Sequence, residues 1–388
     1  HRDLHSFPTR RSSDLRNTIA SLALVATGLS ATPSVADSVM SSWLGPTQPI
    51  TIYGHEEWAA AVKEATGGEV DIRLVLGGAL IPAAATTQGI ADGVAQIGLV
   101  SAAYTPSELP VANALGDLGF ATPDPMVLAF AYADFMMNEP MGYGEWRNNG
   151  VIYAGAHSTP SYHFICKEEL STVADFAGKR IRLFGGGWAR FAEEKLGAVS
   201  VNMTFGEIYT GLERGALDCV AADPTVLTSG PSIKELVTGF TNVALSPYYT
   251  NATWIYNVDF WQGLTDAQRR AIFNESAKAL ARLHVKYAAK VDASLSEATA
   301  YGVTIVNSDE LEAAYEEWVA GDSATAKELA KSKFGIEDPE ALHATFQTYI
   351  DKWKGLMGDM DRTDEAALAA LLKANLYDPI DVSTYGME

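Results

Sequence analysis

The sequence predicts an α/β protein with two lobes, a clamshell whose lobes are bridged by a long helix. Strand and helix patterns alternate between residues 50 and 100, which is typical of a parallel sheet covered by helices. A second alternating unit begins near residue 157, and a strand at 253–257 returns to the first unit. The helical pattern from Thr265 to about Tyr301 would be roughly 55 Å long, and this exceeds the usual width of one domain.

In the first lobe, apolar runs and alternating patterns predict strands, and 3.6-residue periods predict helices. The expected strands are 50–54, 70–76, 95–100 and 151–156, and the expected helices are 56–66, 83–89 and 118–137. Gly67-Gly68 should end the helix at 56–66, because glycine adopts the backbone angles that stop a helix.

The second lobe is expected to hold strands at 162–166, 180–183 and 217–222, with helices at 188–196 and 205–214. The long helix opens with Thr265-Asp266-Ala267-Gln268, a capping box. Further helices begin at Asp338-Pro339 and at Thr363. The predicted domains are therefore a first lobe at 37–156 and 253–334, which includes the long helix, a second lobe at 157–252, and a C-terminal helical extension at 335–388.

The first 36 residues read as a leader rather than as part of the fold. Residues 1–15 have no clear apolar period and resemble translated sequencing-adapter sequence, so they are set aside. Residues 16–36 begin with a basic residue, continue with an apolar run at 19–29, and end in Ser34-Val35-Ala36, the pattern of a secretory signal peptide. The apolar run is too short to span a bilayer. The alternative is a buried N-terminal helix.

Composition excludes several classes of function. The 388 residues include 28 Lys and Arg against 48 Asp and Glu, for a formal charge of −20. Such an acidic surface argues against binding to nucleic acid or to anionic membranes. No Gly-x-Ser-x-Gly or His-Glu-x-x-His motif is found in the sequence. We therefore expect no enzyme, no cofactor and no metal site, and His157 and His163 are not spaced as a metal-binding pair.

Two cysteines occur in the chain, Cys166 and Cys219. Neither lies in a metal-binding spacing. They could form a disulfide in an oxidising compartment. The pattern favours two buried free thiols on strands, and whether they pair is left open.

Five segments carry a resemblance to a known family. The most specific are GKRIRLFGGG at 178–187, which matches a Gly-x-Lys-x-Arg strand, and GAVSVNMTFGEIYTGLERGALDCV at 197–220. Supporting segments are EEWAAAVKEATGGEVDIRLVLGGAL at 56–80, GIADGVAQIGLVSAAY at 89–104 and TWIYNVDFWQGLTDAQRRAI at 253–272. From about Ile50 to Val306 the chain resembles the extracytoplasmic solute receptors of TRAP (tripartite ATP-independent periplasmic) transporters.

This resemblance implies a two-lobed periplasmic-binding-protein clamshell that captures a small organic acid in the cleft between its lobes. It further implies Arg pairing with the ligand carboxylate, hinge closure, a periplasmic location, and a membrane permease with a small and a large subunit as partner. A monomer and a homodimer both fit, and a metal ion beside the ligand is left open. The alternatives are an ABC-type receptor of similar shape, an extracytoplasmic enzyme with a cryptic site, and a sensor domain.

Arg182 is the foremost ligand-binding candidate, because it is the second basic residue of the family's strand motif. In the family this residue forks onto a substrate carboxylate, and a planar guanidinium matches two carboxylate oxygens. Arg180 is the alternative, since it lies two residues earlier on the same face of the strand. A surface Arg on an edge strand would also fit the pattern.

The remaining candidates are weaker, and each has a structural alternative. Tyr104 follows a strand at the end where open sheets bind ligands. Phe205 and Trp188 would lie against the ligand or in the core, and Tyr209 matches the family pattern. The crossover between the lobes supplies Ser158, Tyr162 and His163.

Ala222 and Asp223 are ligand-binding candidates at the end of the strand at 217–222, where the chain departs from the family pattern. Receptors of the sialic-acid type carry a Glu-Asn pair where this chain has Ala221 and Ala222. A sugar acid is therefore disfavoured, and a less polar ligand such as an aromatic acid or a keto acid is suggested. Asp223 would replace part of the lost polarity, or it would cap the turn that begins at Pro224.

Overall fold

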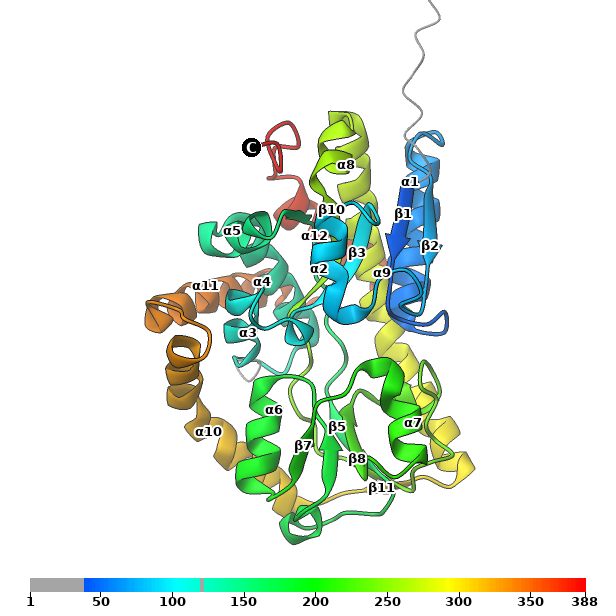
Figure 1. Ribbon diagram of the computed structural model, residues 1–388, viewed down its shortest axis with the longest axis vertical. Helices are drawn as coiled ribbons and strands as arrows, with labels where there is room; N and C mark the ends of the chain where they lie inside the picture. Colours follow the sequence, from blue (N-terminus) through cyan, green and yellow to red (C-terminus); the bar gives the residue numbers. More distant parts are fainter. Residues whose placement is uncertain (1–37, 119–121) are drawn as a thin grey trace, which may run out of the picture. The chain divides into compact units, whose positions relative to one another are not determined.

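The computed structural model describes residues 38–118 and 122–388, and the leader predicted at 1–36 lies outside these ranges. Two sheets organise the described chain, and helices surround each of them (Figure 1). The predicted two-lobed α/β class is confirmed. We call the part around the five-stranded sheet the first lobe and the part around the six-stranded sheet the second lobe.

The first-lobe sheet has the order β2-β1-β3-β10-β4. Its strands are β1 (Ser38–Ser41), β2 (Ile72–Val75), β3 (Ile97–Ser101), β4 (Val151–Tyr153) and β10 (Asn251–Asn257). β1 is parallel to β2 and β3, whereas β10 runs antiparallel to β3 and β4. The helices of this lobe are α1 (Glu57–Ala65), α2 (Thr86–Ala91), α3 (Pro110–Gly116), α4 (Pro125–Asn138), α5 (Pro140–Asn148) and α8 (Val258–Gly263).

One predicted strand is wrong. Residues 50–54 lie within a π-helical segment, η1 (Ile50–Glu56), and the strand at this end of the chain is β1. The apolar run at 50–54 is too short for its period to separate a strand from a buried helix. Thr51 and His55 are buried with it, and η1 packs against the long helix α9 (Asp266–Tyr301).

The second-lobe sheet has the order β11-β9-β5-β8-β6-β7. Its strands are β5 (His163–Cys166), β6 (Arg180–Arg182), β7 (Val199–Val201), β8 (Cys219–Ala222), β9 (Gly239–Thr241) and β11 (Thr304–Val306). β6 is parallel to β7 and β8, and β5 is antiparallel to β8 and β9. Helices α6 (Gly186–Arg190) and α7 (Ile208–Glu213) flank this sheet. β11 pairs with β9 and therefore lies in the second sheet. From the sequence, this strand was expected in the first lobe, within the range 253–334.

The long helix α9 spans 36 residues and bridges the lobes as predicted. Thr265 and Gln268 form the expected capping box, and Gly302 ends the helix in the left-handed conformation. Its first half packs against α1 in the first lobe, and Ala298 near its end packs in a second-lobe cluster. Figure 1 shows α9 extending from the first sheet toward β11.

The C-terminal helices are divided between the two lobes. Helices α10 (Asp309–Ser332), α11 (Pro339–Met357) and α12 (Glu365–Leu372) follow β11. Leu311 and Trp318 of α10 are buried in a second-lobe cluster, whereas α11 packs on α4 and α12 packs on α9 in the first lobe. Phe346, Trp353 and Tyr377 are buried in the same hydrophobic cluster as α4. The helical extension predicted at 335–388 therefore completes this lobe.

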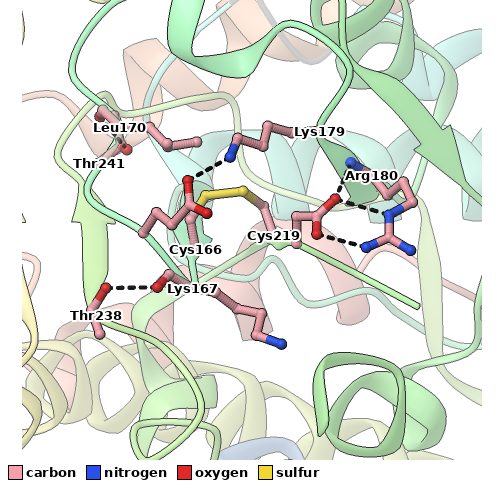
Figure 2. Close-up of a disulfide and its surroundings, with 10 residues drawn as sticks. Cys166, Lys167, Leu170, Lys179, Arg180, Cys219, Thr238 and Thr241 are labelled. Atoms are coloured by element: carbon pink, nitrogen blue, oxygen red, sulfur yellow. Dashed lines mark hydrogen bonds and ion pairs between the residues drawn. A yellow bond between two sulfur atoms is a disulfide. The ribbon is translucent and has the colours of Figure 1, made fainter. Parts of the chain in front are cut away.

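Cys166 and Cys219 form a disulfide, so the preference for two free thiols is wrong (Figure 2). The two residues are register partners on the antiparallel strands β5 and β8, with Cα atoms 4.1 Å apart. Directly opposed positions on such strands bring side chains together. A separation of 53 residues conceals this pairing in the sequence.

Candidate functional site

Arg182 is the last residue of β6, and its side chain is buried, with only 1% of its surface exposed. Its Nε donates to the Met203 carbonyl at 3.0 Å, and Nη2 makes a long hydrogen bond of 3.5 Å to Tyr104 Oη. The guanidinium also lies over the Phe184 ring, 4.9 Å from its centroid. It forms no ion pair with a carboxylate among the residues that the structure describes. A guanidinium has five N–H donors, so donor capacity remains.

Arg182 lines a cavity to which both lobes contribute, named here the Arg182 cavity. Its volume is about 40 Å³, which is room for roughly three water molecules. The cavity is therefore narrow. The residues that line it are Trp43, Leu44, Gln48, Ile50, Leu99, Ser101, Tyr104, His157, Thr159, Tyr162, Arg182, Phe184, Phe205, Asp223, Tyr248 and Tyr287.

Aromatic rings form much of the wall of the Arg182 cavity. Trp43 meets Tyr104 edge-on at a centroid distance of 5.3 Å, and Tyr104 tilts against Phe184 at 4.6 Å. Trp43 also meets Phe205 at 6.4 Å. A wall of rings with few polar groups is the usual construction of a small-molecule site.

Tyr104 couples the two lobes at the Arg182 guanidinium. It follows β3 in the first lobe, and its hydroxyl oxygen accepts from the Phe205 amide of the second lobe at 3.0 Å. Burial raises the pKa of Tyr104, although the nearby Arg182 charge acts to lower it. The neutral hydroxyl therefore keeps its own hydrogen, which it can donate.

Asp223 confirms the predicted cap and also lines the cavity. It is the N-cap of the short 3₁₀ turn at Pro224–Leu227, where its Oδ1 accepts from the Thr225 amide at 3.0 Å and from the Thr225 hydroxyl. Oδ2 accepts from Tyr287 Oη at 3.0 Å. Burial raises the pKa of Asp223, and these hydrogen bonds act in the opposite direction.

Several lining residues were not singled out from the sequence. Trp43 and Gln48 lie beyond the end of β1, a strand that was not predicted, and Tyr287 was read only as part of an apolar stripe on α9. Gln48 is 2% exposed, and its Nε2 has no hydrogen-bond partner within the described ranges. Had β1 been predicted, a search past its carboxyl end would have found Trp43.

His157 brings a neutral ring to the cavity. Its Nδ1 lies 2.9 Å from Thr253 Oγ1, and burial lowers its pKa well below the ordinary value. The sequence placed it in the crossover between the lobes but did not select it. Tyr248, whose hydroxyl donates to the Thr250 carbonyl at 2.7 Å, is a further lining residue that was not predicted.

The structure brings five predicted site residues together at the cavity and places the other six elsewhere. The five at the cavity are Tyr104, Tyr162, Arg182, Phe205 and Asp223. Trp188 stacks on Tyr162 with a centroid distance of 4.8 Å and lines a neighbouring cavity.

Of the five remaining predicted residues, Ser158, His163 and Ala222 are buried near the cavity, and Arg180 and Tyr209 lie at the surface. Ser158 donates to the Thr159 carbonyl, and His163 packs against Phe240 opposite Ala222. Arg180 pairs with Asp218 at 2.7 Å at the other end of β6, beside the disulfide (Figure 2). Tyr209 donates to Glu235 at 2.8 Å.

A family model described as "Bacterial extracellular solute-binding protein, family 7" matches residues 40–321. The chain belongs to this family. The resemblance to TRAP solute receptors that the five sequence segments indicated is thereby confirmed, and similar solved structures include TRAP solute-binding proteins.

Three solved receptors illustrate the similarity of this solute-binding protein to known folds. A TRAP solute-binding protein from Rhodoferax ferrireducens with copurified benzoate has a TM-score of 0.73 at 20% identity, covering 83% of this chain and 99% of that one. One from Bordetella bronchiseptica with bound mandelate gives 0.69 at 22% identity, covering 81% and 99%. A Bordetella pertussis receptor that binds pyroglutamic acid gives 0.66 at 18% identity, covering 80% and 99%.

Two further properties of the receptor concern membranes and metals. None of the helices in the described ranges combines the length and the apolar character needed to cross a membrane. No group of three or more His, Cys, Asp or Glu side chains in the same ranges is arranged to hold a metal ion.

Proposed function

We propose that the receptor captures a small carboxylate in the Arg182 cavity and delivers it to a TRAP permease. The observation that carries the proposal is the buried Arg182 guanidinium, which has spare donors and no ion pair with a carboxylate among the described residues. An isolated buried charge is costly unless it is paired and hydrogen-bonded. A ligand carboxylate would supply both, and bidentate pairing with Arg is among the strongest of such contacts.

The ligand is a small acid with a weakly polar body. Rings of Trp43, Tyr104, Phe184 and Phe205 line the cavity together with the guanidinium, which suits an aromatic or otherwise apolar acid better than a polyhydroxylated sugar acid. Benzoate, mandelate and pyroglutamic acid, which the three similar receptors hold, are all compact carboxylates. The narrow volume favours compact ligands further.

Binding is coupled to closure of the two lobes. The cavity wall combines Trp43, Gln48 and Tyr104 of the first lobe with Arg182 and Asp223 of the second. A ligand held between residues of both lobes would enter while the lobes are apart and be enclosed when they close. Export through the predicted signal peptide at 16–36 would place this cycle in the periplasm, where the permease subunits receive the ligand.

The test is titration calorimetry with matched acids and amides. Benzoate should bind and benzamide, which has nearly the same shape without the charge, should bind at least about a hundredfold more weakly, since a buried guanidinium distinguishes the two. No product should form during prolonged incubation. Equal affinities for acid and amide would contradict carboxylate capture by Arg182.

A further inference from the structure

The Arg182 cavity contains a second ionisable group that enters from the next strand of the same sheet. β6 and β8 are parallel neighbours, with Arg182 opposite Val220. β6 ends at Arg182 and β8 ends at Ala222, so Arg182 and Asp223 both stand at the carboxyl ends of adjacent strands. Both line the cavity, and Asp223 is 4% exposed.

The two oxygens of Asp223 have different surroundings. Oδ1 accepts two hydrogen bonds from Thr225, one from its amide and one from its hydroxyl, and these complete the cap. Oδ2 accepts from Tyr287. A carboxylate oxygen can accept two hydrogen bonds, so Oδ2 retains acceptor capacity on the side of the group that is not used by the cap.

Asp223 forms no ion pair with a Lys, Arg or His side chain of the described part of the chain. Burial raises the pKa of this carboxyl group, and another donor at Oδ2 would stabilise its ionised form. One narrow cavity thus contains a guanidinium that lacks an anion and a carboxyl group that lacks a cation. Such a pair is complementary to a ligand that has an acceptor at one position and a donor at another.

We propose that the ligand carries a hydroxyl or ammonium donor in addition to its carboxylate, and that Asp223 Oδ2 accepts this donor while Arg182 binds the carboxylate. The inference rests on the proposed function, because it takes the carboxylate at Arg182 as given. An acid without the donor would bury Asp223 with its acceptor unused, and sites built around a hydrogen bond discriminate strongly against analogues that lack it.

Four acids with one carbon skeleton test this directly by calorimetry: phenylacetate, mandelate, 3-hydroxyphenylacetate and 2-phenylglycine. The last three add a donor, either a hydroxyl at one of two positions or an ammonium group. At least one of them should bind about tenfold or more tightly than phenylacetate, the effect of one hydrogen bond to a charged group. Phenylacetate binding as tightly as all three would overturn the proposal.

The decisive variant is Asp223→Ser. Serine caps helical turns as well as aspartate does, but it has no atom at the position of Oδ2. The affinity ratio between the donor-bearing acid and phenylacetate should fall to about one, and this ratio is the readout because loss of the Asp223 charge changes the affinity for both acids. Thr225→Val is the matched control, because it removes a bond to Oδ1 only, and it should leave the preference intact. Unfolding temperatures of the ligand-free variants report whether each still folds.

A second variant keeps the test decisive if Asp223→Ser is poorly folded. Tyr287→Phe removes the protein's own donor to Oδ2 and leaves Asp223 in place, so the preference should persist or increase. A preference that disappears in Tyr287→Phe would assign the contact to Tyr287 and overturn the proposal.

The same series distinguishes a hydroxyl donor from an ammonium donor. If the ligand donor is charged, 2-phenylglycine should lose more affinity than mandelate in Asp223→Ser.

Failure of this inference is separable from failure of the proposed function. Equal binding of all four acids would leave carboxylate capture standing and remove the role of Asp223. Absence of binding by every acid here and by benzoate would remove both.

Discussion

At the scale of single residues, the crossover between the lobes is held by a neutral histidine. His284 on α9 accepts from the Ser158 amide through Nε2 at 3.1 Å, and its Nδ1 lies 2.8 Å from the Leu280 carbonyl. An amide only donates and a carbonyl only accepts, so Nδ1 carries the proton and Nε2 does not. Burial lowers the pKa of His284 to about 4, and protonation of Nε2 would break the bond to Ser158.

This tautomer predicts that His284 makes stability depend on pH below neutrality. The pKa of an unfolded histidine is about 6.5, so the unfolded chain binds a proton that the folded chain excludes. The contribution of neutral His284 to the free energy of unfolding is complete above pH 6.5, and it decreases as the pH falls from 6.5 to about 4. Denaturant unfolding between pH 4 and 7 should show a pH-dependent loss up to about 3 kcal/mol larger in wild type than in His284→Gln. Parallel curves for the two proteins would contradict this tautomer.

The sequence predicted part of the site at this scale. Arg182, Phe205 and Tyr104 lie in family-like segments, and the structure brings all three to one cavity. Their ligand contacts remain predictions. Gln48 and Tyr287 could not be singled out, because their contribution depends on how segments far apart in the sequence meet and not on any local pattern.

At the scale of elements, the disulfide fixes β5 to β8 outside the Arg182 cavity, although Cys219 is the register partner of Ile181, the residue next to Arg182. Cys166 and Cys219 are buried beside the exposed Arg180–Asp218 pair (Figure 2), and neither cysteine lines the Arg182 cavity. The bridge should therefore stabilise the second lobe without contributing to ligand contact.

The double variant Cys166→Ala/Cys219→Ala tests this separation of roles. Loss of the cross-link should lower the free energy of unfolding by about 2–4 kcal/mol, as is typical for a native disulfide. Affinity for benzoate, measured at a temperature where the variant is folded, should change by less than about threefold, which is roughly 0.6 kcal/mol. A large loss of affinity in the folded variant would show that the bridge shapes the cavity.

Among elements, long and strongly periodic ones were predictable and short ones were not. The capping box at Thr265 and the apolar stripe fixed the start and identity of α9, which the structure confirms. The segments β1 and η1 have only four and seven residues, and such lengths carry no distinct period. β11 joins the second sheet through pairing with β9, a long-range contact that local sequence does not encode.

At the scale of the whole described chain, the lobes touch through a rim contact that depends on a glycine. Gly230 of the second lobe has φ of 60° and donates its amide to Thr47 Oγ1 of the first lobe at 2.9 Å. A Cβ at this position would lie 1.8 Å from Gln48 Nε2 and 3.0 Å from a ring carbon of Phe205. Because glycine has no Cβ, the Gln48 side chain can occupy its position in the cavity wall.

Gly230→Ala should weaken ligand binding by displacing the Gln48 side chain from the cavity wall. The matched control is Gly215→Ala, since Gly215 also has a positive φ, of 70°, but has no atom within 4 Å of the added methyl group. Both variants should lose about 1–2 kcal/mol of stability from left-handed strain. Only Gly230→Ala should lose ligand affinity. The expected loss is on the order of tenfold, the effect of losing one hydrogen bond such as that between the Gly230 amide and Thr47. Equal affinities of the two variants by calorimetry would contradict the rim contact as part of closure.

The central claim is that one buried guanidinium captures the ligand, and two arginines on the same strand allow a controlled measurement. Arg182→Gln and Arg180→Gln each remove one positive charge from β6, but only Arg182 lines the cavity, whereas Arg180 is exposed and paired with Asp218. Calorimetric titration of benzoate into both variants should show a loss of about 2–5 kcal/mol for Arg182→Gln and almost none for Arg180→Gln. Wild-type affinity in Arg182→Gln would contradict the account.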